Sequence, residues 1–286
     1  ERRKFLPTIR ELQWIKGKFS ETFCDHHRAR FLGAVQFVCG NKREMDLGYH
    51  IDFNLLCKLL SLYTPSWLAE YINDAESYLN FNISYEQLMQ LIDMGYMQEL
   101  SPKRIAQILP GYICIRSSLP KGKDTFNSDL LLKREITLKE HIWYLFEQES
   151  SIGYHNDRAQ TAYKEGTTSR DESFSAAFYR FSLDGHLDRN RLLRATLSTF
   201  NRSFKKDMVN WFAGLFEELQ PRAEELISLQ EEIMQVFTSP YTKPVNVMLQ
   251  QLKKIASEGG FHYQEFIERA TTLFFSSPKN SLLTIY

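Results

Sequence analysis

The chain has 286 residues, with 35 basic and 35 acidic side chains, so its formal net charge is zero. This length allows one large domain or two ordinary ones, each with a well-buried core. The charge balance argues against a generally basic nucleic-acid-binding protein and against an acidic disordered tail. Only 13 glycines and nine prolines are present, which excludes collagen-like and low-complexity sequences.

Helical patterns of apolar residues dominate the sequence. Several helix starts are marked by a hydroxyl residue before a proline, as in Ser101-Pro102, because the hydroxyl accepts a free N–H group and proline has none to lose. Glycines follow the apolar runs at Gly95 and Gly185 and predict left-handed turns there, as does the pair at 259–260. We expect about a dozen helices, near residues 8–19, 22–39, 52–62, 65–73, 84–94, 102–109, 137–149, 171–184, 188–201, 204–219, 222–237, 241–257 and 262–276.

Two polar stretches interrupt the helical pattern. Residues 117–128 include a proline and a glycine and predict a linker between an N-terminal helical subdomain, 1–116, and a C-terminal helical-repeat subdomain, 129–286. A continuous solenoid is the alternative organisation. Residues 150–168 predict a long loop, and loops of this length are often functional. The segment Tyr112–Ile115 could form a strand, but no partner strand is evident, so we interpret it as a connection.

An internal repeat indicates the fold. Residues 185–200 resemble residues 260–275, which lie 75 residues further along the chain. Half of this offset is close to the length of one HEAT-type helical hairpin, roughly 40 residues. The sequence therefore predicts an all-α protein, an α-α superhelix of stacked helical hairpins of HEAT or armadillo-like type. Asp188 precedes an amphipathic run and is expected to cap a helix. The repeated residues are Gly185, Arg194, Ala195, Thr196 and Phe200, which recur as Gly260, Arg269, Ala270, Thr271 and Phe275.

Three segments resemble a known family. They are PSWLAE at residues 65–70, LDRNRLL at 187–193, and residues 204–212, which contain Trp211. They are similar to the N-terminal region of an uncharacterised bacterial family of long all-helical proteins, known only as a domain of unknown function. The resemblance implies a HEAT or armadillo-like fold and a longer parent protein. It implies no catalytic residues, because the family has no known catalytic motif.

Motifs that carry chemistry do not stand out in the sequence. It contains no dinucleotide or phosphate loop, no H-E-x-x-H and no nucleophile elbow. Cys24-Asp25-His26-His27 offers four potential metal ligands, but adjacent helical residues point about 100° apart, so we interpret it as a polar surface turn. The four cysteines form no C-x-x-C pair, and no apolar stretch is long enough to span a membrane. We expect a cytoplasmic, non-enzymatic protein without cofactor, metal or membrane association.

Three functions agree with these observations. The first is a protein–protein interaction scaffold, whose groove binds another protein. The acidic stretch 217–232 balances a basic N-terminal half, so local charged docking surfaces are expected. The second function is a nucleic-acid-binding repeat that uses a basic groove formed by Lys103, Arg104, Arg116, Lys121, Lys123, Lys133 and Arg134.

The third function is an enzyme without a recognised motif, with a pocket near residues 150–168 and His141, Trp143, Tyr154 or His155.

Overall fold

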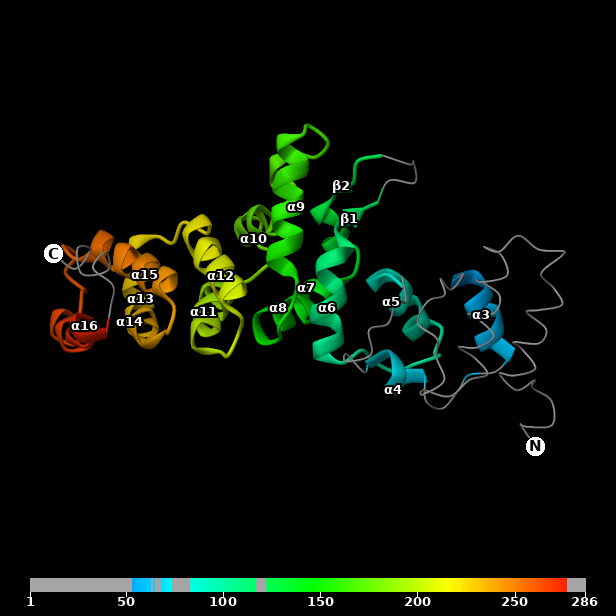
Figure 1. Cartoon of the computed structure of the whole chain (residues 1–286), viewed down its shortest axis with the longest axis horizontal. Coiled ribbons are helices and arrows are strands. Elements are labelled where there is room, and N and C mark those ends of the chain that lie inside the picture. Colours follow the sequence, from blue (N-terminus) through cyan, green and yellow to red (C-terminus); the bar gives the residue numbers. More distant parts are fainter. Residues whose placement is uncertain (1–52, 63, 65–67, 74–82, 117–121, 277–286) are drawn as a thin grey trace. The chain divides into compact units, whose positions relative to one another are not determined.

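The computed structural model describes residues 53–62, 64, 68–73, 83–116 and 122–276 (Figure 1). Within these residues the chain forms fourteen α-helices, five short 3-10 helices and one two-stranded sheet, which confirms the mostly helical class. The helices expected near 8–19 and 22–39, and the Cys24–His27 cluster, lie outside the described residues. The chain divides into two compact units, of which the first ends at Ile108 and the second begins at Leu109.

The first unit is held together at its turns by side chains that cap helices. Ser84 and Gln87 form a reciprocal capping box at the start of α5, in which each side chain accepts the backbone N–H of the other residue. The Ser101 hydroxyl accepts the N–H of Arg104 (3.2 Å) and Pro102 is the first helical residue, as predicted. The helices are α3 (Phe53–Leu62), α4 (Leu68–Asn73), α5 (Tyr85–Asp93) and α6 (Pro102–Tyr112), which continues into the second unit.

After the end of α6, the second unit contains a short hairpin that the sequence does not predict. Strand β1 (Cys114–Ile115) pairs antiparallel with β2 (Thr125–Phe126), so the segment interpreted as a connection is a strand. Strands of two residues are too short to show alternation, and the partner lies inside the polar stretch 117–128. The N–H of Phe126 donates to the Thr168 hydroxyl (3.0 Å). The described part of 117–128 therefore belongs to the second unit.

The expected loop at 150–168 is wrong, because most of it is the 13-residue helix α9 (Ile152–Lys164). Its buried side consists of Ile152, Asn156, Ala159 and Ala162 at spacings of three and four residues. The Asn156 carboxamide oxygen accepts the N–H of Ser175 (3.0 Å) in the first turn of α10 (Phe174–Leu183). Small and polar residues form this buried side, so hydropathy alone does not reveal the helix.

Helix α12 (Lys206–Glu218) contacts four other helices, α9, α10, α11 and α15. In Figure 1, α10 and α16 lie at opposite ends of this group of helices, and α11 to α15 lie between them. The single helices expected at 137–149 and 222–237 are each interrupted, at Glu140 and at Leu229. The other elements are η3 (Ser128–Leu132), α7 (Glu135–Lys139), η4 (His141–Trp143), α8 (Tyr144–Glu147), η5 (Arg170–Glu172), α11 (Arg189–Ser198), η6 (Thr199–Asn201), α13 (Ala223–Ser228), α14 (Gln230–Gln235), η7 (Val236–Thr238), α15 (Thr242–Ile255) and α16 (Tyr263–Ser276).

The two repeated segments share a helix but differ in their turns and burial. Gly185 has φ +77°, the left-handed turn that the sequence predicts, whereas Gly260 is not left-handed. A Cβ at Gly260 would lie 3.0 Å from Cγ2 of Ile227, so close approach explains this glycine. Leu192 is fully buried in α11, whereas its counterpart Ile267 in α16 is 60% exposed. The correspondence therefore extends to local structure more than to packing.

Arg189, the first residue of α11, connects several elements of the second unit. Its guanidinium donates to both carboxylate oxygens of Glu225 in α13 (2.6 and 3.1 Å). It also donates to the Leu219 carbonyl (2.9 Å) at the end of α12 and to the Ser182 hydroxyl (3.2 Å) in α10. Burial raises the pKa of the Glu225 carboxyl, but hydrogen bonds from Arg189 and from the Arg222 backbone outweigh this and lower it overall.

We expect R189A to lower the free energy of unfolding of the second unit by about 2–4 kcal/mol. The substitution leaves a partly buried carboxylate and a helix-terminal carbonyl without their donor. Urea denaturation at neutral pH measures the change, and R170A, an exposed arginine in the same unit, is the matched control. Equal stability of the two variants would contradict the role of Arg189.

Candidate functional site

A groove of about 620 Å³ lies between the η4–α8 segment and α11 in the second unit. Trp143, Phe146 and Glu147 line one wall. The other wall is formed by the residue that caps α11, by the outer side of that helix, and by Arg202 just after η6. Most of the groove therefore comes from two short segments about 45 residues apart in the chain.

Capping and amphipathicity of α11 determine which of its residues face the groove. The Asp188 carboxylate accepts the N–H of Arg191 (2.6 Å) and fixes the start of the helix, as the sequence predicts. The buried side of the helix consists of Leu192, Leu193, Thr196 and Leu197. The groove is lined instead by Arg191, Arg194, Ala195 and Ser198, which are spaced three and four residues apart and share one face.

The closest contact across the groove joins an arginine to an indole ring. The guanidinium carbon of Arg191 lies 3.9 Å from the ring centroid of Trp143, a cation–π contact. Trp143 is 5% exposed, and its buried indole N–H has no hydrogen-bond partner among the described residues. Phe146 lies behind the groove and packs its ring against Phe178 and Phe212 in the core, at centroid distances of 5.7 and 5.2 Å. The aromatic wall is therefore backed by the core of the unit.

The charges along the groove are mixed. Arg194 forms an ion pair with Glu232 and donates to the Asn190 carboxamide (2.8 Å), so its charge is already balanced. Arg191 and Arg202 have no carboxylate partner in the part of the chain that the structure describes, and both are exposed. The acidic residues at the groove are Glu147 and the capping Asp188. The groove thus offers two available guanidinium groups between two carboxylates.

The basic residues predicted to bind nucleic acid do not line this groove. Arg104 is 7% exposed, and Lys123 pairs with Glu165 at 3.1 Å, so both are already engaged within the protein. Lys121 lies outside the described residues. Lys103 and Arg104 belong to the first unit, whereas the second unit contains Arg116, Lys123, Lys133 and Arg134.

The four residues predicted for an unrecognised active site are placed differently from one another. Trp143 lines the groove, whereas His141, its neighbour in η4, is 8% exposed and its pKa is lowered by burial. Tyr154 and His155 lie on α9, where Tyr154 is 63% exposed. Among the four, only Trp143 contributes to the groove.

His155 belongs to a separate cluster between α9 and the β-hairpin. Its Nδ1 is buried without a hydrogen-bond partner among the described residues. Burial, followed by the positive charges of Arg158 and Arg116, lowers the pKa of His155 to about 4. Arg158 itself forms an ion pair with Asp124, which directly precedes β2. The imidazole is therefore neutral at neutral pH.

Cys114 completes this cluster without forming a reactive centre. Its Sγ lies 3.8 Å from Oδ2 of Asp124. Burial raises the pKa of the Cys114 thiol, although the positive charge of Arg158 opposes this effect. A nucleophilic cysteine requires the thiolate, so at neutral pH this side chain behaves as a structural thiol.

Comparison with known proteins places the chain in a family. The family described as Domain of unknown function (DUF6493) matches residues 1–280. The chain belongs to this family. The match extends over both units and includes the groove, and it confirms the resemblance to a family of unknown function. No curated protein and no solved structure matches the chain.

The longest helices that the structure of the DUF6493 chain describes, α15 and α16, have 14 residues each. In its described part, no helix combines the length and the apolar character that crossing a lipid bilayer requires. The exposed surface instead includes isolated large apolar side chains, such as Tyr154 and Ile267.

We expect acidification from pH 6.5 to pH 4 to destabilise the wild-type protein more than H155Q. The unfolded His155 binds a proton below its ordinary pKa of 6.5, whereas the folded one stays neutral until about pH 4. Stability is therefore lost as the pH falls through this range, by up to about 3 kcal/mol. Urea denaturation of both proteins at several pH values measures the difference, and parallel pH profiles would contradict it.

Proposed function

We propose that this DUF6493 chain is a protein–protein interaction scaffold that holds a peptide segment of a partner protein in the groove between α8 and α11. The observation that carries the proposal is the pair of exposed arginines in the groove, Arg191, which lies against the buried ring of Trp143, and Arg202. Arginine and tryptophan are the side chains most enriched among residues that dominate binding energy at protein interfaces. Guanidinium groups also bind carboxylates in a bidentate, directional way.

The charges of the groove favour a particular kind of peptide. A carboxylate of the partner fits beside Arg191 or Arg202, and an apolar side chain next to it fits against the aromatic wall. Glu147 and Asp188 repel a continuous row of negative charges. A partner segment with an isolated acidic residue next to an apolar one therefore suits the groove better than a nucleic-acid backbone does.

The proposal includes the arrangement of the helices. We propose that the helices of the second unit form an α-α superhelix of HEAT or armadillo-like type, in which each helical hairpin packs against its neighbours. The repeated segments at 185–200 and 260–275, and the contacts of α12 with α11 before it and α15 after it, support this arrangement. We also propose a cytoplasmic location, which agrees with the free thiols of Cys57 and Cys114.

Selection from a peptide-display library on the full chain tests this function. We expect the selected peptides to share one acidic residue beside an apolar or aromatic residue. In fluorescence anisotropy, the R191A/R202A double variant should raise Kd for such a peptide about tenfold or more. Replacing the peptide's acidic residue with its amide should have a similar effect, since both changes remove the same contact.

Two further variants separate this function from nucleic-acid binding. K133A removes an exposed lysine of the same unit outside the groove and should leave the peptide affinity unchanged. E147Q removes an acidic group from the groove and should increase the affinity for peptides with two adjacent acidic residues. If a single-stranded oligonucleotide binds more tightly than any selected peptide, and K133A weakens it, the nucleic-acid alternative is favoured and the peptide proposal fails.

A further inference from the structure

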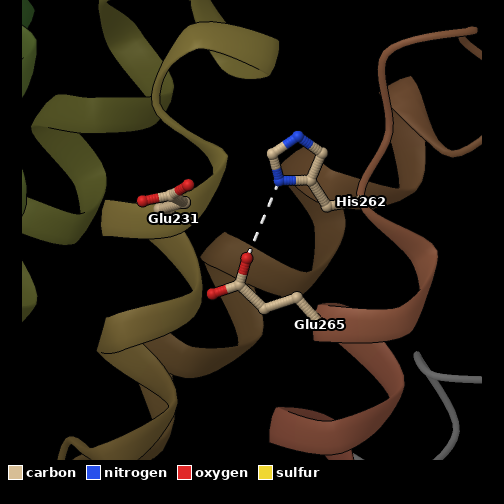
Figure 2. Close-up of side chains that lie close together, drawn as sticks. All are labelled: Glu231, His262 and Glu265. Atoms are coloured by element: carbon tan, nitrogen blue, oxygen red, sulfur yellow. Dashed lines mark ion pairs between the residues drawn. The ribbon is translucent and has the colours of Figure 1, made fainter.

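A second cluster of polar side chains lies near the end of the described chain and shares no residue with the groove. Glu231 in the first turn of α14, His262 just before α16, and Glu265 in the first turn of α16 point toward one another (Figure 2). One ligand atom from each lies within 4.8 Å of the other two. The Nδ1 atom of His262 and Oε2 of Glu265 are 3.7 Å apart, which is too long for a hydrogen bond.

A buried side chain holds the backbone of this cluster in place. Gln230 is 3% exposed, and its carboxamide oxygen accepts the N–H of His262 (2.8 Å). Its amide group donates to the carbonyls of Gly260 and Ile227, both at 3.0 Å. Because Gln230 directly precedes Glu231, these bonds fix the glutamate next to the histidine although they are 31 residues apart in the chain.

The carboxylate of Glu265 is already oriented by a second partner. Its Oε1 accepts a hydrogen bond from Nε of Arg269 (2.9 Å), one turn further along α16, and forms an ion pair with Nη2 of the same side chain (2.8 Å). The other oxygen faces His262 (Figure 2). Carboxylates that bind metals are commonly hydrogen-bonded in this way by a second residue, which orients them.

The local charge leaves room for a cation. Arg269 forms an ion pair with Glu265, whereas Glu231 has no ion pair among the described residues. One imidazole and two carboxylates, without a thiolate, suit Zn²⁺ or a similar divalent transition-metal ion. Two ligands bound to one zinc at about 2.0–2.1 Å are roughly 3.4 Å apart, so the 3.7 Å between His262 and Glu265 needs little adjustment.

We propose that Glu231, His262 and Glu265 bind one divalent transition-metal ion, with Zn²⁺ as the best match. The ion connects the start of α14 to the start of α16. Three protein ligands leave a fourth tetrahedral position open to water or to a ligand from another molecule. This site shares no residue with the groove, so it stands or fails independently of the proposed function.

Titration of the full chain with Zn²⁺ tests the site. In isothermal titration calorimetry we expect one equivalent bound by the wild-type protein and lost in both H262A and E231Q. The matched controls are H186A and E268Q, which remove an exposed histidine and an exposed glutamate outside the cluster and should retain that equivalent. Cysteines elsewhere in the chain are present in every variant, so Zn²⁺ bound to them appears equally in all.

Thermal unfolding provides a second measurement. Free Zn²⁺ at ten times Kd should raise the Tm of the wild-type protein by about 3–6 °C, because the ion binds the folded state alone. The same Zn²⁺ concentration should leave the Tm of H262A and E231Q unchanged. If both variants bind the same equivalent with the same affinity as the wild type, or if the wild-type protein binds none, the site does not exist.

Discussion

The arrangement of the second unit depends on the side chain of Arg189. Arg189 lies in the first turn of α11, and its planar guanidinium group donates hydrogen bonds to α10, to the end of α12 and to the first turn of α13. Several short helices meet at this point, and each leaves polar backbone groups that need partners. The carbonyl of Gln220, whose φ of 47° is left-handed, is among the groups that Arg189 satisfies. The interaction therefore stabilises a chain reversal as well as the packing of neighbouring helices.

The position of Arg189 also explains how the groove is formed. With residue 189 turned toward α13 and the leucines of α11 turned toward the core, Arg191 and Arg194 are left on the outer side. The rotation of one helix about its axis thus places a structural arginine and the groove arginines on different faces. The rest of the groove requires only that η4 and α8 pack beside this helix, as the contact of α8 with α11 and that of Trp143 with Arg191 indicate.

The sequence was informative where local physical chemistry determines the structure. The cap at Asp188, the left-handed turn at Gly185 and the helix start at Pro102 follow from single residues, and all are confirmed. The long amphipathic helices such as α12 and α15 follow from apolar spacing. Helix α9 was missed because its buried side uses Asn156 and alanines, whose burial depends on neighbours that are distant in the sequence.

The candidate sites could not have been found in the same way. Trp143 and Arg191 are 48 residues apart, and Glu231 and His262 are 31 apart, so no motif of fixed spacing connects them. Both contacts arise only when helices pack. The predicted basic residues show the opposite case. Lys103 and Arg134 are close in the sequence, but they belong to different units and so form no common surface within one unit. Sequence proximity identified helices here, whereas the proposed binding residues are brought together by packing.

The hairpin between α6 and η3 has a consequence for how the chain can change in length. Its short strands are fixed at the base by the hydrogen bond from Asn127 to Ile113 (2.9 Å) and by the bond from Phe126 to Thr168. Because these contacts close the loop at its base, residues added between the strands leave the helical core unaltered. Doubling the length of such a loop costs only about 0.6 kcal/mol of closure entropy. This makes the hairpin a suitable position for an engineered tag or an inserted domain.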